Sequence, residues 1–223
     1  PTGWTTMDRS RTGSLRSKMV TDNSAKTKGL PQDVESVLRE LRRHASKRFR
    51  ADMATRYGIV TQTQVLGTPM AKIKSIAKPL GRDHAFAAAL WETGVYEARM
   101  LASMVDEPDR VTATQMDRWI KDCDNWAIVD TLAFNLFDRT PHAFAMVAKW
   151  SRSRDEFVKR AGFALLACLA LHGRGQDNDY REALPLIERA AHDERNLVKK
   201  GVSWALSPIG GKPSPRLRVS ARS

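Results

Sequence analysis

FVKRAGFALLA (157–167) and LVKKGVSWALS (197–207) are matching stretches that lie 40 residues apart. Each has an apolar residue, a valine, a lysine and a second base, followed by apolar residues at helical spacing. YEARMLASMV (96–105) and WAIVDTLAFNLF (126–137) repeat this pattern more loosely, and each of the four follows another amphipathic segment: HAFAAALWETG, TATQMDRWIKD, HAFAMVAKWSR or YREALPLIERAA. Paired helices that recur every ~30–40 residues predict a HEAT-like helical-repeat solenoid with a concave face for an extended partner. An ordinary helical bundle with chance similarity is the alternative.

The remaining sequence also favours an all-α fold. From Pro31 onward apolar residues recur at helical intervals, and the one short strand-like stretch, VTQTQVLG (60–67), is interpreted as a loop. We expect a disordered basic arm at 1–30, a repeat domain at 31–206 and a basic tail at 207–223. Because proline is costly inside a helix, Ser207-Pro208 predicts that the last helix ends near Leu206.

Composition limits the class of protein more than it defines a function. The chain has 223 residues, of which 42% are hydrophobic, and no run approaches the ~20 apolar residues of a membrane span. Two cysteines are too few for a disulfide framework, which favours a reducing, cytoplasmic compartment. The five histidines lack metal-protease spacing, so no metal site is expected. The net charge of +12 permits a polyanionic partner, but most of it belongs to residues 1–30 and 205–223.

Several residues of the repeats have side chains suited to chemistry on nucleic acid. Trp126 and Asp130 are four residues apart and therefore share a helix face. Taken alone, they are more simply explained as a core aromatic and an aspartate paired with a neighbouring base. Later repeats add two pairs of basic residues. The first is Lys159 and Arg160, and the second, Lys199 and Lys200, precedes a second tryptophan, Trp204. Basic side chains suit phosphate oxygens, and aromatic faces can stack on a base or a sugar.

Six stretches between residues 50 and 206 carry a resemblance to a known family: RYGI (56–59), GRDHAFAAALWETGVYEARMLA (81–102), EPDRVTATQMDRWIKDCDNW (107–126), LFDRTPHAFAMVAKW (136–150), DEFVKRAGFALLACLALH (155–172) and DERNLVKKGVSWAL (193–206). Over these residues the chain resembles the HEAT-like DNA alkylation repair glycosylases of the AlkD type. The resemblance implies that Trp126 and Trp204 are the two active-site tryptophans, Asp130 the catalytic aspartate and Arg160 the active-site arginine. Two features depart from the family: Ala127 stands where many relatives have an acid, and Ser207-Pro208 interrupts the last motif.

The resemblance also implies a reaction. A purine alkylated at N3 or N7 carries a positive charge and can leave as a neutral base, while the sugar develops oxocarbenium character. Asp130 would stabilise that sugar and orient water, and Trp126 and Trp204 would contact the deoxyribose. The flanking phosphates would be held by Arg160, together with Lys159, Lys199 and Lys200. The family grips the backbone of the lesion without a base-reading pocket, which implies tolerance of bulky adducts. We therefore expect a monomeric, monofunctional glycosylase acting on alkylated double-stranded DNA in the cytoplasm, without cofactor or metal.

Two other functions remain open at this stage. A HEAT-repeat paralogue could bind nucleic acid without glycosylase activity, and the altered sequence after Leu206 favours that alternative. A protein-binding scaffold is the second, because solenoids often serve as interaction platforms. The scaffold predicts no convergence of Trp126, Asp130, Arg160 and Trp204 in space.

Overall fold

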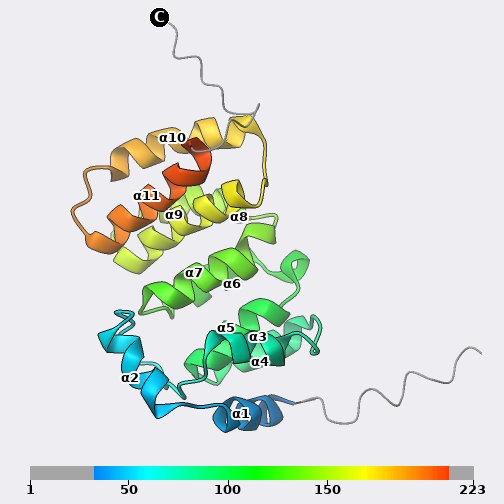
Figure 1. The fold of residues 1–223 in the computed structure, drawn as a ribbon. Helices are drawn as coiled ribbons and strands as arrows, with labels where there is room; N and C mark the ends of the chain where they lie inside the picture. The colour runs from blue at the N-terminus through cyan, green and yellow to red at the C-terminus, as the bar shows by residue number, and fades with distance from the viewer. Residues whose placement is uncertain (1–32, 211–223) are drawn as a thin grey trace, which may run out of the picture. The chain divides into compact units, whose positions relative to one another are not determined.

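The computed structural model describes residues 33–210, whose regular secondary structure is helical. The expected basic arm at 1–30 and most of the expected tail, residues 211–223, lie outside the described residues. Within the described part, eleven α-helices and two short 3-10 helices follow one another along the chain (Figure 1). They are α1 (Val34–Arg43), α2 (Lys47–Thr55), α3 (Met70–Ala77), α4 (His84–Glu92), α5 (Tyr96–Val105), η1 (Pro108–Arg110), α6 (Ala113–Lys121), α7 (Trp126–Asn135), η2 (Phe137–Arg139), α8 (Ala143–Trp150), α9 (Glu156–Leu171), α10 (Asp177–Ala190) and α11 (Asn196–Gly210).

The predicted helix pairs are confirmed. The four amphipathic segments form α4, α6, α8 and α10, and the repeat motifs that follow them form α5, α7, α9 and α11. α9 packs against α7, α8 and α11, so the two best-matching motifs lie side by side (Figure 1). Gly162 permits the close approach of α9 to α8, since a Cβ there would lie 2.7 Å from the Ser151 backbone nitrogen. The helices are thus stacked repeat upon repeat.

The stretch at 60–67 is a loop, as the sequence predicts. Among the described residues the only β-type pairing is an isolated bridge between Gln64 and Val95. The buried carboxylate of Glu97 on α5 accepts hydrogen bonds from the backbone N–H groups of Leu66, Gly67 and Thr68. These charge-assisted bonds fix the loop against the helices, because each satisfies a backbone group that would otherwise be buried without a partner.

The largest fully buried side chains of the core are aromatic. Trp91, Trp119 and Trp150 are almost fully buried, as are Phe137 and Phe163. Trp91 and Trp119 stack with ring centroids 4.2 Å apart, which joins α4 to α6. Half of the six tryptophans therefore have structural roles, and this packing holds the helices that carry the remaining candidates.

The predicted end of the last helix is wrong. α11 continues past Leu206 and through Pro208 to Gly210, so the repeat domain extends beyond residue 206. Pro208 lacks the backbone N–H that would bond to the carbonyl group of Trp204. Because the proline lies in the final turn of α11, few backbone hydrogen bonds of the helix follow it. Ile209, only 8% exposed, anchors the turn that follows Pro208. Burial of that side chain offsets the lost hydrogen bond.

Two further observations concern classes of site. None of the helices in residues 33–210 is long and apolar enough to cross a membrane. The same residues contain no group of three or more histidine, cysteine, aspartate or glutamate side chains placed to hold a metal ion. Cys123 and Cys168 are both buried free thiols.

Candidate functional site

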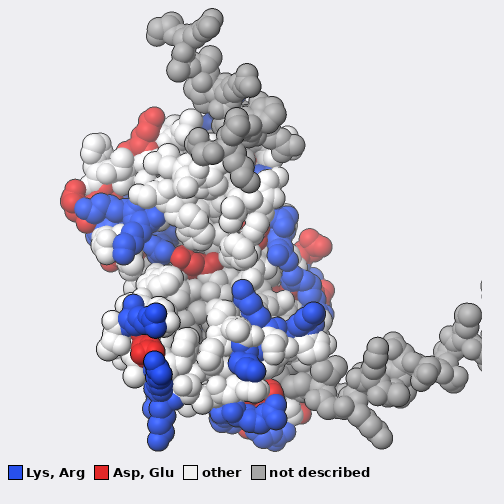
Figure 2. All heavy atoms as spheres, in the orientation of Figure 1, with Lys and Arg blue, Asp and Glu red and all other residues white. Residues whose placement is uncertain are grey.

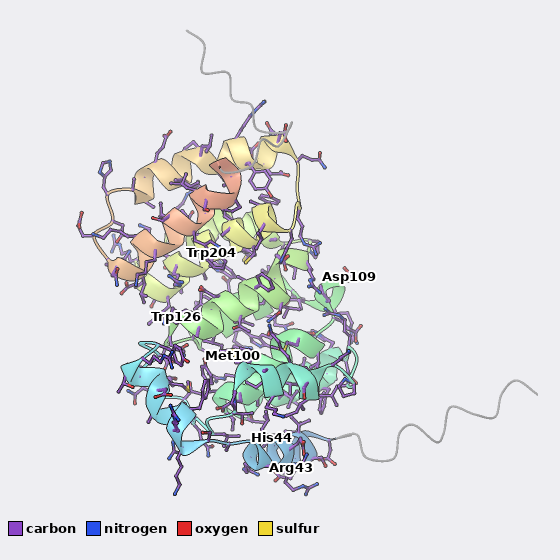
Figure 3. The ribbon with its side chains drawn as sticks, viewed as in Figure 1. Arg43, His44, Met100, Asp109, Trp126 and Trp204 are labelled. Carbon is purple, nitrogen blue, oxygen red and sulfur yellow. The ribbon has the colours of Figure 1, made fainter. Side chains whose placement is uncertain are left out.

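A pocket of about 390 Å³ opens where α2, α3, α5, α7 and α11 approach one another. Three of the four predicted catalytic residues line it: Trp126 and Asp130 from α7 and Trp204 from α11. The remaining lining residues are Phe49, Met53, Tyr57, Ile59, Thr68, Met70, Ile73, Lys74, Tyr96, Met100, Ala127, Thr131, Phe134 and Asn135. This part of the helical stack carries Trp126, Trp204 and the more deeply buried Met100 (Figure 3). Asp109 lies away from them, at the other end of the helices.

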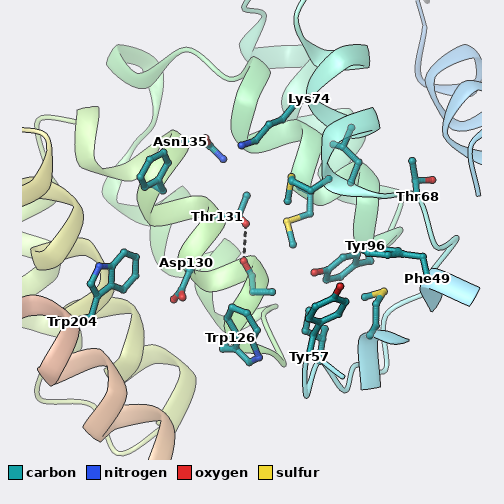
Figure 4. A pocket seen from close by; sticks show the side chains of 17 residues that line it. Phe49, Tyr57, Thr68, Lys74, Tyr96, Trp126, Asp130, Thr131, Asn135 and Trp204 are labelled. Atoms are coloured by element: carbon teal, nitrogen blue, oxygen red, sulfur yellow. Dashed lines mark hydrogen bonds between the residues drawn. The ribbon is translucent and has the colours of Figure 1, made fainter. Parts of the chain in front are cut away.

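The start of α7 sets the positions of Trp126 and Asp130. The Asn125 side chain caps this helix by accepting hydrogen bonds from the backbone N–H groups of Ala127 and Ile128. Trp126 is therefore the first helical residue, and Asp130 lies one turn later on the same face. In the close view, Asp130 lies between Trp126 and Trp204 (Figure 4). Trp126 also lines a second pocket, of about 280 Å³, and so forms part of the wall between the two.

Arg160, the fourth predicted residue, reaches this site from α9 and is directed at Asp130. Its Nε donates to Oδ1 of Asp130 at 3.0 Å and its Nη2 donates to Oδ2 at 2.7 Å. Its Nη1 donates to the backbone carbonyl oxygen of Leu197 at 2.9 Å, and the guanidinium lies 5.9 Å from the ring centroid of Trp126. The side chain is 8% exposed, so this geometry positions Asp130 rather than presenting an open contact for phosphate.

The environment of Asp130 shifts its acidity. Burial raises the pKa of the Asp130 carboxyl above its ordinary value, because the charged form loses water, and the hydrogen bonds and charge of Arg160 oppose that rise. The guanidinium is always protonated, and a two-pronged pair with it requires both carboxylate oxygens as acceptors. Asp130 is thus held as an oriented anion in a poorly hydrated position, where the adjacent guanidinium offsets part of its field.

The three lysines predicted to contact DNA have different environments. Lys159 is 17% exposed and forms an ion pair with Asp193 at 2.8 Å. Lys199 is exposed and pairs with Glu194, also at 2.8 Å. Lys200 is exposed and forms no ion pair with the described residues. Of the three, Lys200 is the one whose ammonium group is open to an external anion.

Other unpaired basic side chains gather on α2 and α3, beside the pocket. All are exposed and none forms an ion pair within residues 33–210: Lys47, Arg48, Arg50, Arg56, Lys72, Lys74 and Lys78. Figure 2 shows Lys and Arg atoms at one edge of this face, over α2 and near the start of α11. A largely uncharged hollow separates this edge from further basic atoms. The net charge does not reveal this basic edge, because acidic and basic residues nearly balance over residues 31–204.

Sequence patterns also did not reveal the other aromatic residues that line the pocket. Phe49 and Tyr57 come from α2 and the turn that follows it, Tyr96 begins α5, and Phe134 lies one turn beyond Asp130. Figure 4 shows Trp204 on one side of the pocket and Tyr57 and Tyr96 on the other. Isolated aromatic residues in amphipathic helices are usual for a hydrophobic core, so nothing in their spacing distinguishes a pocket wall from buried packing.

Comparison with known proteins agrees with this fold. A solved structure described as "A new family of proteins related to the HEAT-like repeat DNA glycosylases with affinity for branched DNA structures" superposes with a TM-score of 0.69. The sequences are 23% identical, and the match covers 79% of this chain and 75% of the other. The fold is therefore an all-α HEAT-like repeat. No curated protein matches the sequence. The DNA alkylation repair enzyme family matches residues 37–219, and this chain belongs to that family.

Proposed function

We propose that the protein is a DNA glycosylase that hydrolyses the N-glycosidic bond of cationic N3- or N7-alkylated purines in duplex DNA. The observation that carries this proposal is the carboxylate of Asp130, held by Arg160 between Trp126 and Trp204 at a pocket with a basic edge. The convergence of these four residues also argues against a protein-binding scaffold, which predicts no such cluster.

The chemistry requires little from the protein besides charge and position. The bond between C1′ and the purine nitrogen breaks with its electron pair going to the base, which leaves neutral. Asp130 stabilises the resulting oxocarbenium character, and Trp126 and Trp204 present electron-rich faces to it. Water then adds to C1′ and loses a proton, which leaves an abasic site. Since no amine attacks the sugar, the strand is not cut.

The proposal is tested by incubating methylated duplex DNA with excess protein and measuring free 3-methyladenine and 7-methylguanine over time. Release well above the spontaneous rate, with intact strands until heating in base, is the expected result. A rate equal to the spontaneous one would overturn the proposal. Strand cleavage without base treatment would contradict the monofunctional mechanism.

The second candidate is a DNA-binding protein without glycosylase activity. Two observations favour it: the affinity for branched DNA described for the similar solved structure, and the engagement of both Asp130 oxygens by Arg160. This function predicts tighter binding to a four-way junction than to a duplex of the same length, with no base release from either. The glycosylase predicts base release from the alkylated duplex, whatever the order of the two affinities.

A further inference from the structure

Three arginines from different repeats lie at the carboxyl-terminal ends of neighbouring helices. Arg139 ends η2, directly after α7, and Arg174 follows the end of α9. Arg82 donates through Nη1 to the backbone carbonyl oxygen of Asp106, the residue that follows α5. Because α7 packs against both α5 and α9, these three residues, here called the distal arginines, are neighbours. They lie at the opposite end of α7 from Trp126.

A buried carboxylate holds two of these arginines without enclosing them. The side chain of Asp138 is 0% exposed, and its Oδ2 accepts a hydrogen bond from Nε of Arg174 at 2.9 Å. The same oxygen lies 2.6 Å from Nδ1 of His172, and Oδ1 lies 3.9 Å from Nε of Arg139. The side chains of Arg174 and Arg139 remain 41% and 38% exposed. Since a guanidinium has five N–H donors, most of their donors form no hydrogen bond within residues 33–210.

The charges of the distal arginines are only partly neutralised. The single charge of the buried carboxylate is shared by two of them, and Arg82 is bonded to a neutral carbonyl group. The Asp106 side chain is already engaged by His84 and Gln115. Partial burial and, next, the charge of Arg139 lower the pKa of Arg82, against the opposing effect of Asp106. Both guanidiniums stay protonated and repel each other, so an anion beside them would be stabilising.

The distance to Asp130 suits a duplex. Asp138 follows Asp130 by eight residues, which corresponds to roughly 12 Å at a rise of about 1.5 Å per residue. That length equals about three to four base pairs along the helix axis, or the width of one major groove, ~12 Å. A duplex seated at Asp130 is therefore large enough to reach the distal arginines. Figure 2 shows Lys and Arg atoms on both sides of the largely uncharged hollow.

We propose that Arg82, Arg139 and Arg174 form a second phosphate-binding site, which holds the duplex backbone across the hollow from the basic edge on α2 and α3. This inference rests on the proposed function, which places the damaged nucleotide at Asp130, and deepens it by assigning a contact to the flanking DNA. A planar guanidinium donates two parallel hydrogen bonds to phosphate oxygens, and the carboxylate of Asp138 orients two of the three before DNA binds. DNA held on both sides of the hollow keeps one sugar at Asp130.

The first test measures affinity at several salt concentrations for a duplex that carries an abasic-site analogue. Arg139→Ala is expected to weaken binding about threefold to tenfold and to lower the slope of log affinity against log salt by about 0.9. Arg82→Gln should lower the slope in the same way, and it carries both tests if Arg139→Ala does not fold. Arg189→Ala is the matched control, because this exposed arginine bonds only within α10, and it should leave affinity and slope unchanged.

The second test replaces the phosphates of that duplex one at a time with neutral methylphosphonates. We expect a replacement about three to four base pairs from the analogue, or across the groove from it, to weaken binding of the wild type. The same replacement should cost Arg139→Ala nothing further, whereas Arg189→Ala should behave as the wild type does. Identical profiles for the wild type and Arg139→Ala would overturn the second site.

Neither measurement depends on base release, so the two proposals fail separately. A lowered slope without release of methylpurines keeps the second site and overturns only the proposed glycosylase. Release of methylpurines with an unchanged slope in Arg139→Ala overturns only the second site. A lower melting temperature with an unchanged slope also overturns it, because the distal arginines would then serve only to stabilise the ends of their helices.

Discussion

Asp130 on α7 and Arg160 on α9 are joined by two parallel hydrogen bonds, of 3.0 Å and 2.7 Å, in a largely buried position. The simplest explanation of Asp130 from sequence, a carboxylate paired with a neighbouring base, is therefore confirmed, and this pairing is compatible with the proposed catalytic role. The arginine that neutralises Asp130 also fixes the direction of both carboxylate oxygens. It further contacts the Leu197 carbonyl group and so connects α7 to the helix that carries Trp204.

Replacing Asp130 with asparagine is expected to lower methylpurine release about 10²–10³-fold, because an amide keeps the shape of the carboxylate without its charge. Asp109→Asn, an exposed aspartate on η1, is the matched control and should leave the rate unchanged. Single-turnover release from methylated duplex measures both variants. Equal rates for the wild type and Asp130→Asn would eliminate the proposed role of this carboxylate.

Arg160→Ala is expected to destabilise the fold by up to about 3–5 kcal/mol, because it leaves Asp130 buried without its partner. Arg152→Ala, an exposed arginine outside any ion pair in residues 33–210, provides the control and should change stability little. Urea denaturation measures the free energy of unfolding. A loss as small as that of Arg152→Ala would show that the pair contributes no more than a surface contact.

The basic edge on α2 and α3 is expected to contact phosphates. Arg50→Ala and Lys74→Ala should each weaken duplex binding and lower the slope of log affinity against log salt by about 0.9. Arg43→Ala is the control, since this arginine already pairs with Glu40 on α1, and it should leave the slope unchanged. Three variants with the same slope would exclude this edge from the DNA interface.

The two lysines Lys159 and Lys200 are expected to act differently, although the sequence assigns them one role. Lys200→Ala should weaken DNA binding and leave the melting temperature unchanged, because its ammonium group is free. Lys159→Ala should lower the melting temperature and leave the salt slope unchanged, because it breaks the ion pair with Asp193. Paired melting and binding measurements separate the two, and the reverse result would contradict the structural assignment.

The activity should be lost at a pH above the range in which an ordinary aspartate takes up its proton. Burial raises the pKa of Asp130, so its carboxylate takes up a proton at a higher pH than the usual value of about 3.9. The rate of release, corrected for spontaneous depurination, should therefore fall as the pH decreases toward that raised pKa, while Asp130→Asn shows no such fall. An acid limb at or below 3.9 would contradict the effect of burial.

Much of the fold follows from local sequence patterns. The helix pairs, the loop at 60–67 and the matching motifs on α9 and α11 are set by apolar spacing and by capping residues such as Asn125, which act over a few neighbouring residues. The end of α11 was mispredicted because a rule for proline in isolated helices omits the burial of Ile209.

The roles of the basic residues depend on tertiary contacts. Arg160 and Lys200 occupy the same position in two motifs 40 residues apart, and sequence alone gives them the same role. α11 packs over α9, so Arg160 is buried and turned to Asp130, whereas no described helix follows α11 and Lys200 stays exposed. The sequence by itself determined the helices and the identities of Trp126, Asp130, Arg160 and Trp204. Only the stacking of repeats decided which charges are buried in pairs and where a pocket remains, because both depend on what each helix packs against.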